Sequence, residues 1–198
     1  NQGRLEAVGD EVLSPYWVKA DQTQRVGVRM LGAWHTARAG PGAPANNSYL
    51  FWFERWDGGA APPSHDILQA TGLDDQRLLP RLLAPDGGAV ETPDGRGAPA
   101  VASFDPGTQA FGVLIEREYS DEALQQQEPL CPHSFPCCPA GVTCGHRVRF
   151  WPYKDVNGAV VPNSYIVSVD WHVMDFSTSN YDYNDEIYLF QNMTPAPK

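Results

Sequence analysis

Acidic and amide side chains crowd the C-terminal region, where two apolar segments, 164–171 and 185–191, flank a short polar loop. Crowded carboxylates cost energy unless a cation or a set of hydrogen-bond donors neutralises them. Calcium suits this task because it takes about six to eight oxygen ligands from carboxylates, amides and carbonyls. We therefore predict a structural calcium site in this loop. Its candidate ligands are Asp170, Asp175, Asn180, Asp182, Asn184 and Asp185.

The spacing of these residues leaves an alternative open. Asn180, Asp182 and Asn184 alternate, so an extended chain turns their side chains the same way. Asp185 reaches the same point only if the following strand begins with a bulge or a turn. The pattern differs from the EF-hand loop, because it has no glycine at the turn and no glutamate at the end. The alternative is a set of turn-forming residues that hydrogen-bond their own backbone and bind no ion.

The cysteines are confined to one short stretch. An even number at this density indicates local disulfide bonds and an oxidising compartment. A bond between the two adjacent cysteines would be strained, so we expect each to pair outward with one of the flanking cysteines. A zinc site that also uses His133 and His146 is an alternative, although the spacing matches no paired zinc motif. The disulfide candidates are Cys131, Cys137, Cys138 and Cys144.

The aromatic run 49–56 and several separate tryptophans suggest another kind of site. Exposed, coplanar rings on one face of a sheet can stack on the C–H surfaces of a sugar. The competing interpretation is packing, because Trp and Phe on alternating strands usually bury their rings. The candidate stacking residues are Trp52, Trp56 and Trp151, and Trp34 and Trp171 are further rings of this type.

No catalytic motif is present in the sequence. It has no serine in a Gly-x-Ser-x-Gly elbow and no His-Glu-x-x-His metal pattern. Glu116 and Glu118 flank Arg117, but carboxylate pairs occur by chance in a chain with 24 acidic residues. We therefore expect that the protein is not an enzyme.

The composition limits the partners and the compartment. A net charge of −10 argues against a nucleic-acid partner and against an anionic membrane surface. No apolar run approaches the roughly 18 residues of a membrane-spanning helix, so we expect no membrane insertion. The chain does not begin with Met. Together with the cysteines, this leads us to expect a processed protein or an excised domain that is secreted, extracellular or periplasmic.

Short alternating segments separated by turns predict the fold. Gly and Pro number 18 each, and a hydrophobic fraction of 42% supports a packed core in 198 residues. We predict an all-β, two-layer antiparallel β-sandwich of the jelly-roll type with one or two short helices, as a single domain 1–198. Residues 129–145 are expected to form a cysteine-rich, disulfide-bonded insert, and 194–198 a linker-like tail. Expected strands cover 15–18, 25–34, 49–56, 111–115, 146–153, 164–171 and 186–191. Helical patterns cover 64–70 and 74–83, with one helical turn at 120–124.

Several segments resemble a known kind of module. The most specific are Phe150–Asp155, Val161–Val167, Asn180–Asp185 and Tyr188–Phe190. Together they resemble the ending of a β-sandwich module that recurs in large secreted bacterial multidomain proteins, often beside sugar-binding or repeat domains. The resemblance implies no reaction, and the cysteine insert departs from it.

The Asp-Tyr-Asn-Asp element of that resemblance is similar to one in bacterial extracellular domains associated with calcium. This likeness implies that Asp182 and Asp185 are the best ligand candidates, followed by Asp175 and Asp170.

We expect a secreted, non-catalytic accessory or surface-assembly module with a structural calcium site in the loop before its last strand. A carbohydrate-binding module is one alternative, and it requires exposed tryptophans or tyrosines. A structural subunit of a larger extracellular or periplasmic complex is the other. It requires an apolar surface patch larger than a monomer usually shows.

Overall fold

A computed structural model describes residues 5–35, 47–71, 75–84, 89–94, 97–125, 146–170 and 182–197. The described chain is nearly all β. Its elements are β1 (Trp17–Lys19), β2 (Val26–His35), β3 (Asn47–Glu54), β4 (Ser64–Thr71), β5 (Asp75–Leu78), β6 (Arg81–Leu82), β7 (Val101–Phe104), β8 (Phe111–Ile115), β9 (Glu118–Tyr119), α1 (Glu122–Gln125), β10 (Val148–Lys154), β11 (Val160–Val169), β12 (Glu186–Gln191) and β13 (Met193–Pro195). Within these residues, no helix has the length and apolar character needed to cross a membrane.

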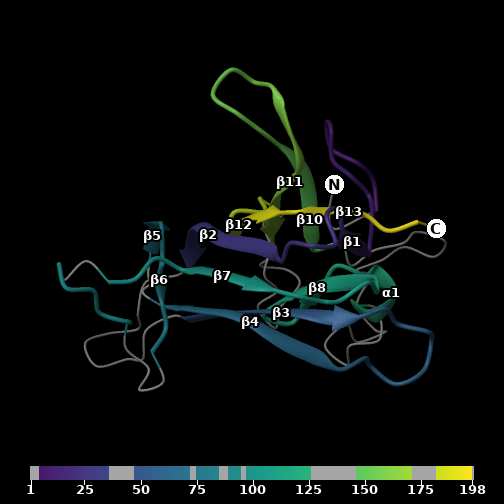
Figure 1. Ribbon diagram of the computed structural model, residues 1–198, viewed down its shortest axis with the longest axis horizontal. Helices are drawn as coiled ribbons and strands as arrows, with labels where there is room; N and C mark the ends of the chain where they lie inside the picture. The colour runs from purple at the N-terminus through teal and green to yellow at the C-terminus, as the bar shows by residue number, and fades with distance from the viewer. Residues whose placement is uncertain are drawn as a thin grey trace.

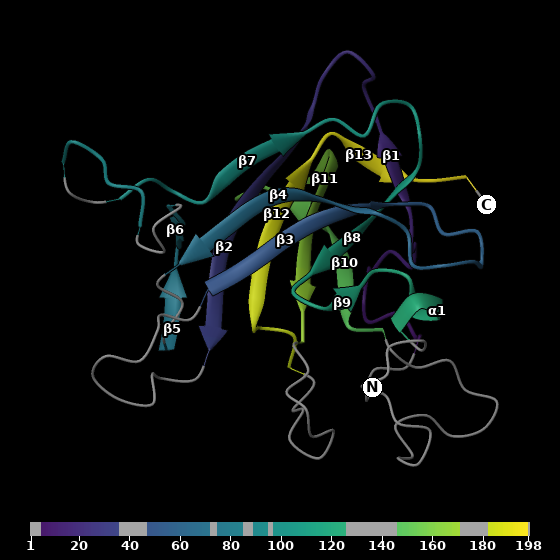
Figure 2. The ribbon, with the colours of Figure 1, turned by 90° about the horizontal axis from the view of Figure 1, so that it is seen from below.

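The strands form two antiparallel sheets (Figure 1). The seven-stranded sheet, sheet A, has the order β13-β1-β8-β3-β4-β6, with β9 paired to β8. The six-stranded sheet, sheet B, has the order β10-β11-β12-β2-β5, with β7 also paired to β2. Figure 2 shows β3, β4 and β8 crossing in front of sheet B, so the two sheets form two layers.

A hydrophobic core fills the space between the sheets. Trp17 of β1 is fully buried, and its ring lies 4.6 Å from the rings of both Phe150 and Tyr165 of sheet B. Along β2, Val26, Val28 and Met30 point inward at alternate positions, as the period of a half-buried strand requires. Further core residues are Leu50, Trp52, Phe104, Phe111, Val113, Ile115, Val148, Val167, Val169, Tyr188 and Phe190.

A smaller apolar cluster lies on the outer face of sheet A, where α1 covers it. Its buried members are Tyr16, Phe53, Leu114 and Leu124. Asp121 caps α1, because its carboxylate accepts a hydrogen bond from the backbone N–H of Ala123. The hydroxyl of Tyr16 donates to the other oxygen of Asp121 and so ties the helix to the start of β1.

Gly112 lets the Phe53 ring lie flat across β8. The two residues are direct cross-strand partners, and a Cβ at position 112 would lie 2.1 Å from Phe53 Cζ. We expect Gly112→Ala to lower the free energy of unfolding by about 1–3 kcal/mol, because the buried ring must leave its place. The matched control is Gly27→Ala, since a Cβ there meets its nearest atom at 3.9 Å. Urea denaturation of both variants checks this, and equal stabilities would contradict it.

The β10–β11 hairpin rises above the two sheets in Figure 1. At its tip, the Asp155 carboxylate accepts hydrogen bonds from the backbone N–H groups of Asn157 and Ala159, and Gly158 adopts a φ of 81°. This is the turn that the Asp-Val-Asn-Gly sequence predicts.

The all-β class, the antiparallel pairing and the seven expected strands are confirmed, with shifts of a few residues at their ends. The helical patterns at 64–70 and 74–83 were wrong, because β4 and β5 pair with β3 and β2 in these regions. A helical turn forms at α1, close to the expected 120–124. Thr194 and Pro195 pair with β1 in β13, so the expected linker-like tail begins later than 194. The cysteine insert, 129–145, lies outside the described residues.

Candidate functional site

Asp170, one of the expected calcium ligands, forms an ion pair inside the protein. It is 1% exposed, and its Oδ2 accepts a hydrogen bond of 2.7 Å from Arg147 Nη1. Arg147 therefore supplies a counter-charge for this carboxylate among the described residues. Asp175 and Asn180 lie outside the described residues.

The three remaining candidates, Asp182, Asn184 and Asp185, lie just before β12. Asp182 is exposed, and its carboxylate accepts from the backbone N–H of Asn184 at 3.4 Å. The backbone carbonyl of Asp185 accepts from Trp34 N–H at 2.9 Å. Over the described residues, no group of three or more His, Cys, Asp or Glu side chains is arranged to hold a metal. The calcium site stays a prediction that depends on residues outside the described ranges.

The tryptophans expected to stack on sugars do not form one exposed platform. Trp52 was predicted wrongly: it is 9% exposed, belongs to the core and stacks on His65 with centroids 4.0 Å apart. Trp56 and Trp151 are half-buried, and their indole N–H groups donate to the carbonyls of Gly59 and Val8. Trp34, which is 50% exposed, is the only large exposed ring among the described tryptophans.

A buried polar cluster joins the two sheets, and we call His35, Ser48, Glu186 and Tyr188 the inter-sheet cluster. Glu186 is fully buried at the start of β12. Its Oε2 accepts hydrogen bonds from the hydroxyls of Ser48 at 2.6 Å and Tyr188 at 2.8 Å. Its Oε1 lies 3.3 Å from Nε2 of His35. Since Ser48 is on sheet A and Glu186 on sheet B, the cluster connects the two layers.

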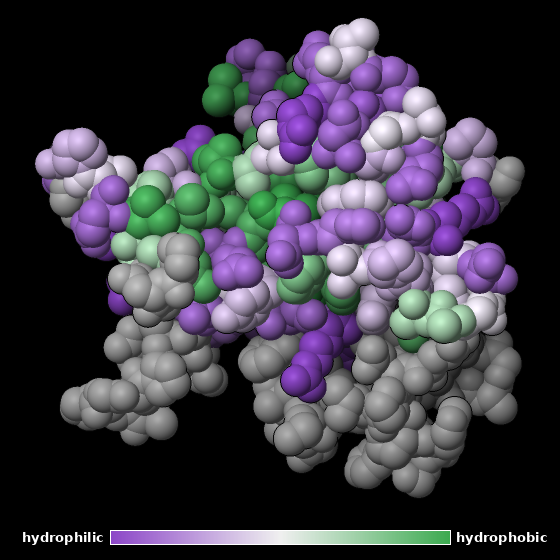
Figure 3. Space-filling model, turned by 60° about the horizontal axis from the view of Figure 1, so that its bottom comes forward, coloured by the Kyte–Doolittle hydropathy of each residue, from purple (hydrophilic) through white to green (hydrophobic). Residues whose placement is uncertain are grey.

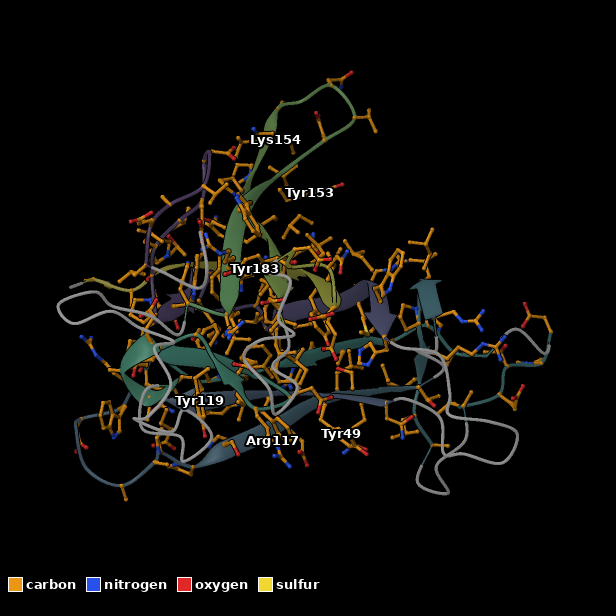
Figure 4. The ribbon with its side chains drawn as sticks, turned by 180° about the vertical axis from the view of Figure 1, so that it is seen from behind. Tyr49, Arg117, Tyr119, Tyr153, Lys154 and Tyr183 are labelled. Carbon is orange, nitrogen blue, oxygen red and sulfur yellow. The ribbon has the colours of Figure 1, made fainter. Side chains whose placement is uncertain are left out.

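Glu116 lies next to the inter-sheet cluster and closes the end of β8. Its N–H donates to the carbonyl of Tyr49, and its carboxylate accepts from Tyr49 N–H at 2.8 Å. Its backbone has a φ of 56°, in a region that non-glycine residues rarely adopt. Burial and the negative charge of Glu186 raise the pKa of Glu116 to about 7. In Figure 4 its neighbour Arg117 lies near Tyr49 on the lower sheet.

The raised pKa of Glu116 predicts a pH-dependent stability. Its pKa is about 7 in the folded protein and 4.5 for an unperturbed glutamate, so its contribution to stability is complete below pH 4.5 and is lost as the pH rises through 7. We expect the wild type to lose about 2 kcal/mol more than Glu116→Gln between pH 5 and pH 8. The glutamine keeps an acceptor for Tyr49 N–H. Urea denaturation at both pH values checks this, and equal losses in the two proteins would contradict it.

A second buried polar cluster, which we call the clasp, consists of Glu11, Glu122, His146 and Arg149. Glu11 Oε1 lies 2.6 Å from Nε2 of His146, and its Oε2 accepts from Arg149 Nη1 at 2.5 Å. Glu122 of α1 lies 3.0 Å from Nδ1 of the same histidine. His146 therefore faces a carboxylate with each ring nitrogen, an arrangement that suits the doubly protonated imidazolium.

The electrostatics of the clasp agree with this arrangement. Burial lowers the pKa of His146, but its hydrogen bonds with Glu11 and Glu122 outweigh burial, and the pKa is raised. Burial raises the pKa of Glu11, but the hydrogen bonds from His146 and Val8 N–H outweigh it, and the pKa is lowered. The ring of Tyr183 covers the guanidinium of Arg149 at 4.4 Å. Both nitrogens of His146 therefore face carboxylates, while the cysteines and His133 of the zinc alternative lie outside the described residues.

The sequence predicts only part of these clusters. The alternation of Arg147, Val148, Arg149 and Phe150 indicates that the arginines face away from the core. Neither Glu11 nor Glu186 was a candidate, because nothing in a single sequence links Glu11 to His146, 135 residues away, or Ser48 to Glu186, 138 residues away.

The fold and these clusters define a class: a nearly all-β protein of two packed antiparallel sheets, joined by buried carboxylate clusters. Comparisons of this chain with protein-family models, with curated proteins and with solved structures gave no match.

Proposed function

We propose that this protein is a non-catalytic β-sandwich module of the jelly-roll type that binds another protein through the outer face of sheet B. The observation that supports this most directly is a group of exposed apolar side chains on adjacent strands. Leu78 is 80% exposed, Trp34 50% and Val101 49%. Apolar side chains scattered singly on a surface are ordinary, whereas a contiguous group suggests an interaction site.

The strand register supports a common face for these residues. Val28 points into the core, so its neighbour Arg29 points outward. Arg29 is paired with Val101 on one side and with Leu189 on the other. The same outward row continues through Ile166. Each of these pairs brings side chains together on the face of sheet B that is turned away from sheet A.

A second outward row begins at Leu78. This residue is paired with Gly32, which in turn is paired with Ile187 of β12. Trp34 follows Gly32 on the same face. A sheet face open to water usually carries polar residues, so this apolar face favours a partner. Figure 3 views the other side of the molecule, with the bottom of Figure 1 brought forward, and there too hydrophobic residues gather in one area bordered by polar ones.

A protein partner fits this face better than a sugar. Stacking on sugars needs two or more exposed coplanar rings, whereas this face combines one exposed indole and the exposed Arg29 with branched aliphatic side chains. Carbohydrate binding through Trp34 remains the alternative.

The proposal also includes the expected secreted setting, the disulfide-bonded insert and the calcium site. The cysteines and the acidic loop of the sequence support these parts.

Site-specific cross-linking tests the proposed function. A photoactivatable residue at position 78, in the protein made in its native host, is expected to capture a discrete partner. The same residue at position 156, which is 101% exposed at the hairpin tip, serves as the control and should capture none. Adding Trp34→Asp and Val101→Asp should remove most of the product at position 78. Equal capture at both positions, or no capture at 78, would overturn the proposal, while glycan binding lost in Trp34→Ala would favour the alternative.

A further inference from the structure

The N-terminal segment Leu5–Ser14, which we call the strap, covers the edge of sheet B. Strand β10 is the last strand of that sheet, and the strap lies against its outer side. Val12 N–H donates to the carbonyl of Phe150 at 2.8 Å. The side chains of Trp151 and Arg149 donate to the carbonyls of Val8 and Glu6. The strap thus covers a strand edge that would otherwise be open to another extended chain.

The attachment of the strap depends on a few residues. Positions 5–10 of the strap are all exposed, including Leu5 at 38% and Val8 at 47%. Glu11, in contrast, is 8% exposed, and Val12 packs against the core. The strap has no strand or helix of its own. A segment whose first six residues are exposed, and which buries one carboxylate and packs one apolar side chain, is suited to local detachment.

The strap and the β10 edge of sheet B carry opposite charges. The strap carries the acidic residues Glu6, Asp10 and Glu11, and the edge strand region carries His146, Arg149 and Lys154. Asp10 pairs with Lys154 at 2.6 Å, and Glu11 pairs with Arg149 at 2.5 Å. These contacts place a basic edge on a chain whose net charge is −10. The edge therefore selects acidic partners.

The groups that receive Glu11 are held in place from other directions. Glu122 binds the far nitrogen of His146, and the Tyr183 hydroxyl donates to the backbone carbonyl of His146 at 2.8 Å. The Tyr183 ring covers the guanidinium of Arg149. Figure 4 shows Tyr183 beside the lower part of the hairpin, while Tyr153 and Lys154 lie farther up. The carboxylate socket is therefore built by parts of the chain that do not belong to the strap.

We propose that the strap is displaceable, and that the edge of β10 which it covers is a binding site for an extended acidic peptide, one glutamate of which takes the place of Glu11 between His146 and Arg149. Recognition then combines backbone hydrogen bonds along the strand edge with a charge-assisted carboxylate contact. Pro152 has no N–H to donate, so the edge offers pairing on its N-terminal half, where the socket lies. This site adjoins the apolar face of sheet B at its β10 end, because Trp151, which donates to the strap, is the cross-strand partner of Ile166.

A labelled peptide with the strap sequence Leu-Glu-Ala-Val-Gly-Asp-Glu-Val-Leu-Ser tests the proposal by fluorescence anisotropy. The protein is the full chain with Glu11→Gln, whose own strap is weakened. We expect this variant to bind the peptide at least about tenfold more tightly than the wild type does. A peptide with glutamine at the place of Glu11 should bind it at least about tenfold more weakly. Asp10→Asn is the matched control, because it removes an exposed ion pair of the same strap, and it should bind no more tightly than the wild type.

A folded Glu11→Gln variant that fails to bind the peptide, or that binds both peptides equally, overturns the proposal. Far-ultraviolet circular dichroism establishes whether the variant is folded. If it is not folded, amide hydrogen exchange of the wild type replaces the measurement. Saturating peptide should then speed exchange at Val12 and leave exchange in β12 unchanged, and no change at Val12 overturns the proposal.

Discussion

Glu186→Ala is expected to lower the free energy of unfolding by about 3–5 kcal/mol, a large part of the stability of a typical domain. Glu186 is fully buried and is the shared acceptor of the Ser48 and Tyr188 hydroxyls. Its removal takes the acceptor from both hydroxyls, which lie 2.7 Å apart and keep one hydrogen bond between them. A buried polar group that loses an acceptor costs about 1–3 kcal/mol, and the deleted side-chain volume adds a cavity.

Two matched variants separate the parts of this effect. Ser48→Ala deletes one donor and leaves Glu186 in place, so it should cost about 1 kcal/mol. Glu186→Gln keeps the volume and one acceptor, and we expect an intermediate loss. Urea denaturation at pH 6 gives the three values. If Glu186→Ala costs no more than Ser48→Ala, the cluster does not join the two sheets in the way we describe.

Much of the fold could be predicted from the sequence, because its strands alternate clearly. Val26, Val28 and Met30 point inward at every second position, and the structure buries all three. The two helical interpretations failed for a physical reason. Segments 64–70 and 74–83 have apolar spacing that fits a helix, but β4 gains a full ladder with β3, and β5 pairs with β2. Tertiary pairing overrode a weak local preference.

The candidate site was harder to predict, since its contacts join distant parts of the chain. Crowded acidic residues were expected to need a cation. For Asp170 the counter-charge is Arg147, and for Glu11 it is Arg149 together with His146. The principle that buried carboxylates need neutralisation holds for both residues. What the sequence does not contain is the identity of the neutralising group, because this depends on which strands become neighbours.

The two buried clusters use acidic residues to connect different parts of the fold. The inter-sheet cluster holds sheet A to sheet B, while the clasp holds the strap and α1 to the edge of sheet B. Both clusters contain a histidine with a raised pKa, so both contribute stability that is complete below the ordinary histidine value of 6.5 and is lost as the pH rises through the folded pKa. Mildly acidic conditions therefore stabilise the contacts of both clusters.

Arg149→Ala is expected to cost about 3–5 kcal/mol, because it leaves the buried carboxylate of Glu11 without one of its two cationic partners. The arginine side chain is 1% exposed, donates to Glu11 at 2.5 Å and packs under the Tyr183 ring. Glu11→Ala should cost a similar amount, since it leaves Arg149 buried and His146 with one carboxylate fewer.

The double variant Glu11→Ala with Arg149→Ala decides whether these two residues act as a pair. Once the first charge is gone, removing the second relieves an unpaired buried ion, so the losses should not add. We expect the double variant to be about 2 kcal/mol more stable than the sum of the single losses predicts. Asp10→Ala with Lys154→Ala is the control cycle, because that ion pair is about half exposed and its coupling should be at most about 0.5 kcal/mol. Equal coupling energies in the two cycles, measured by urea denaturation, would show that burial of the clasp does not strengthen its ion pair.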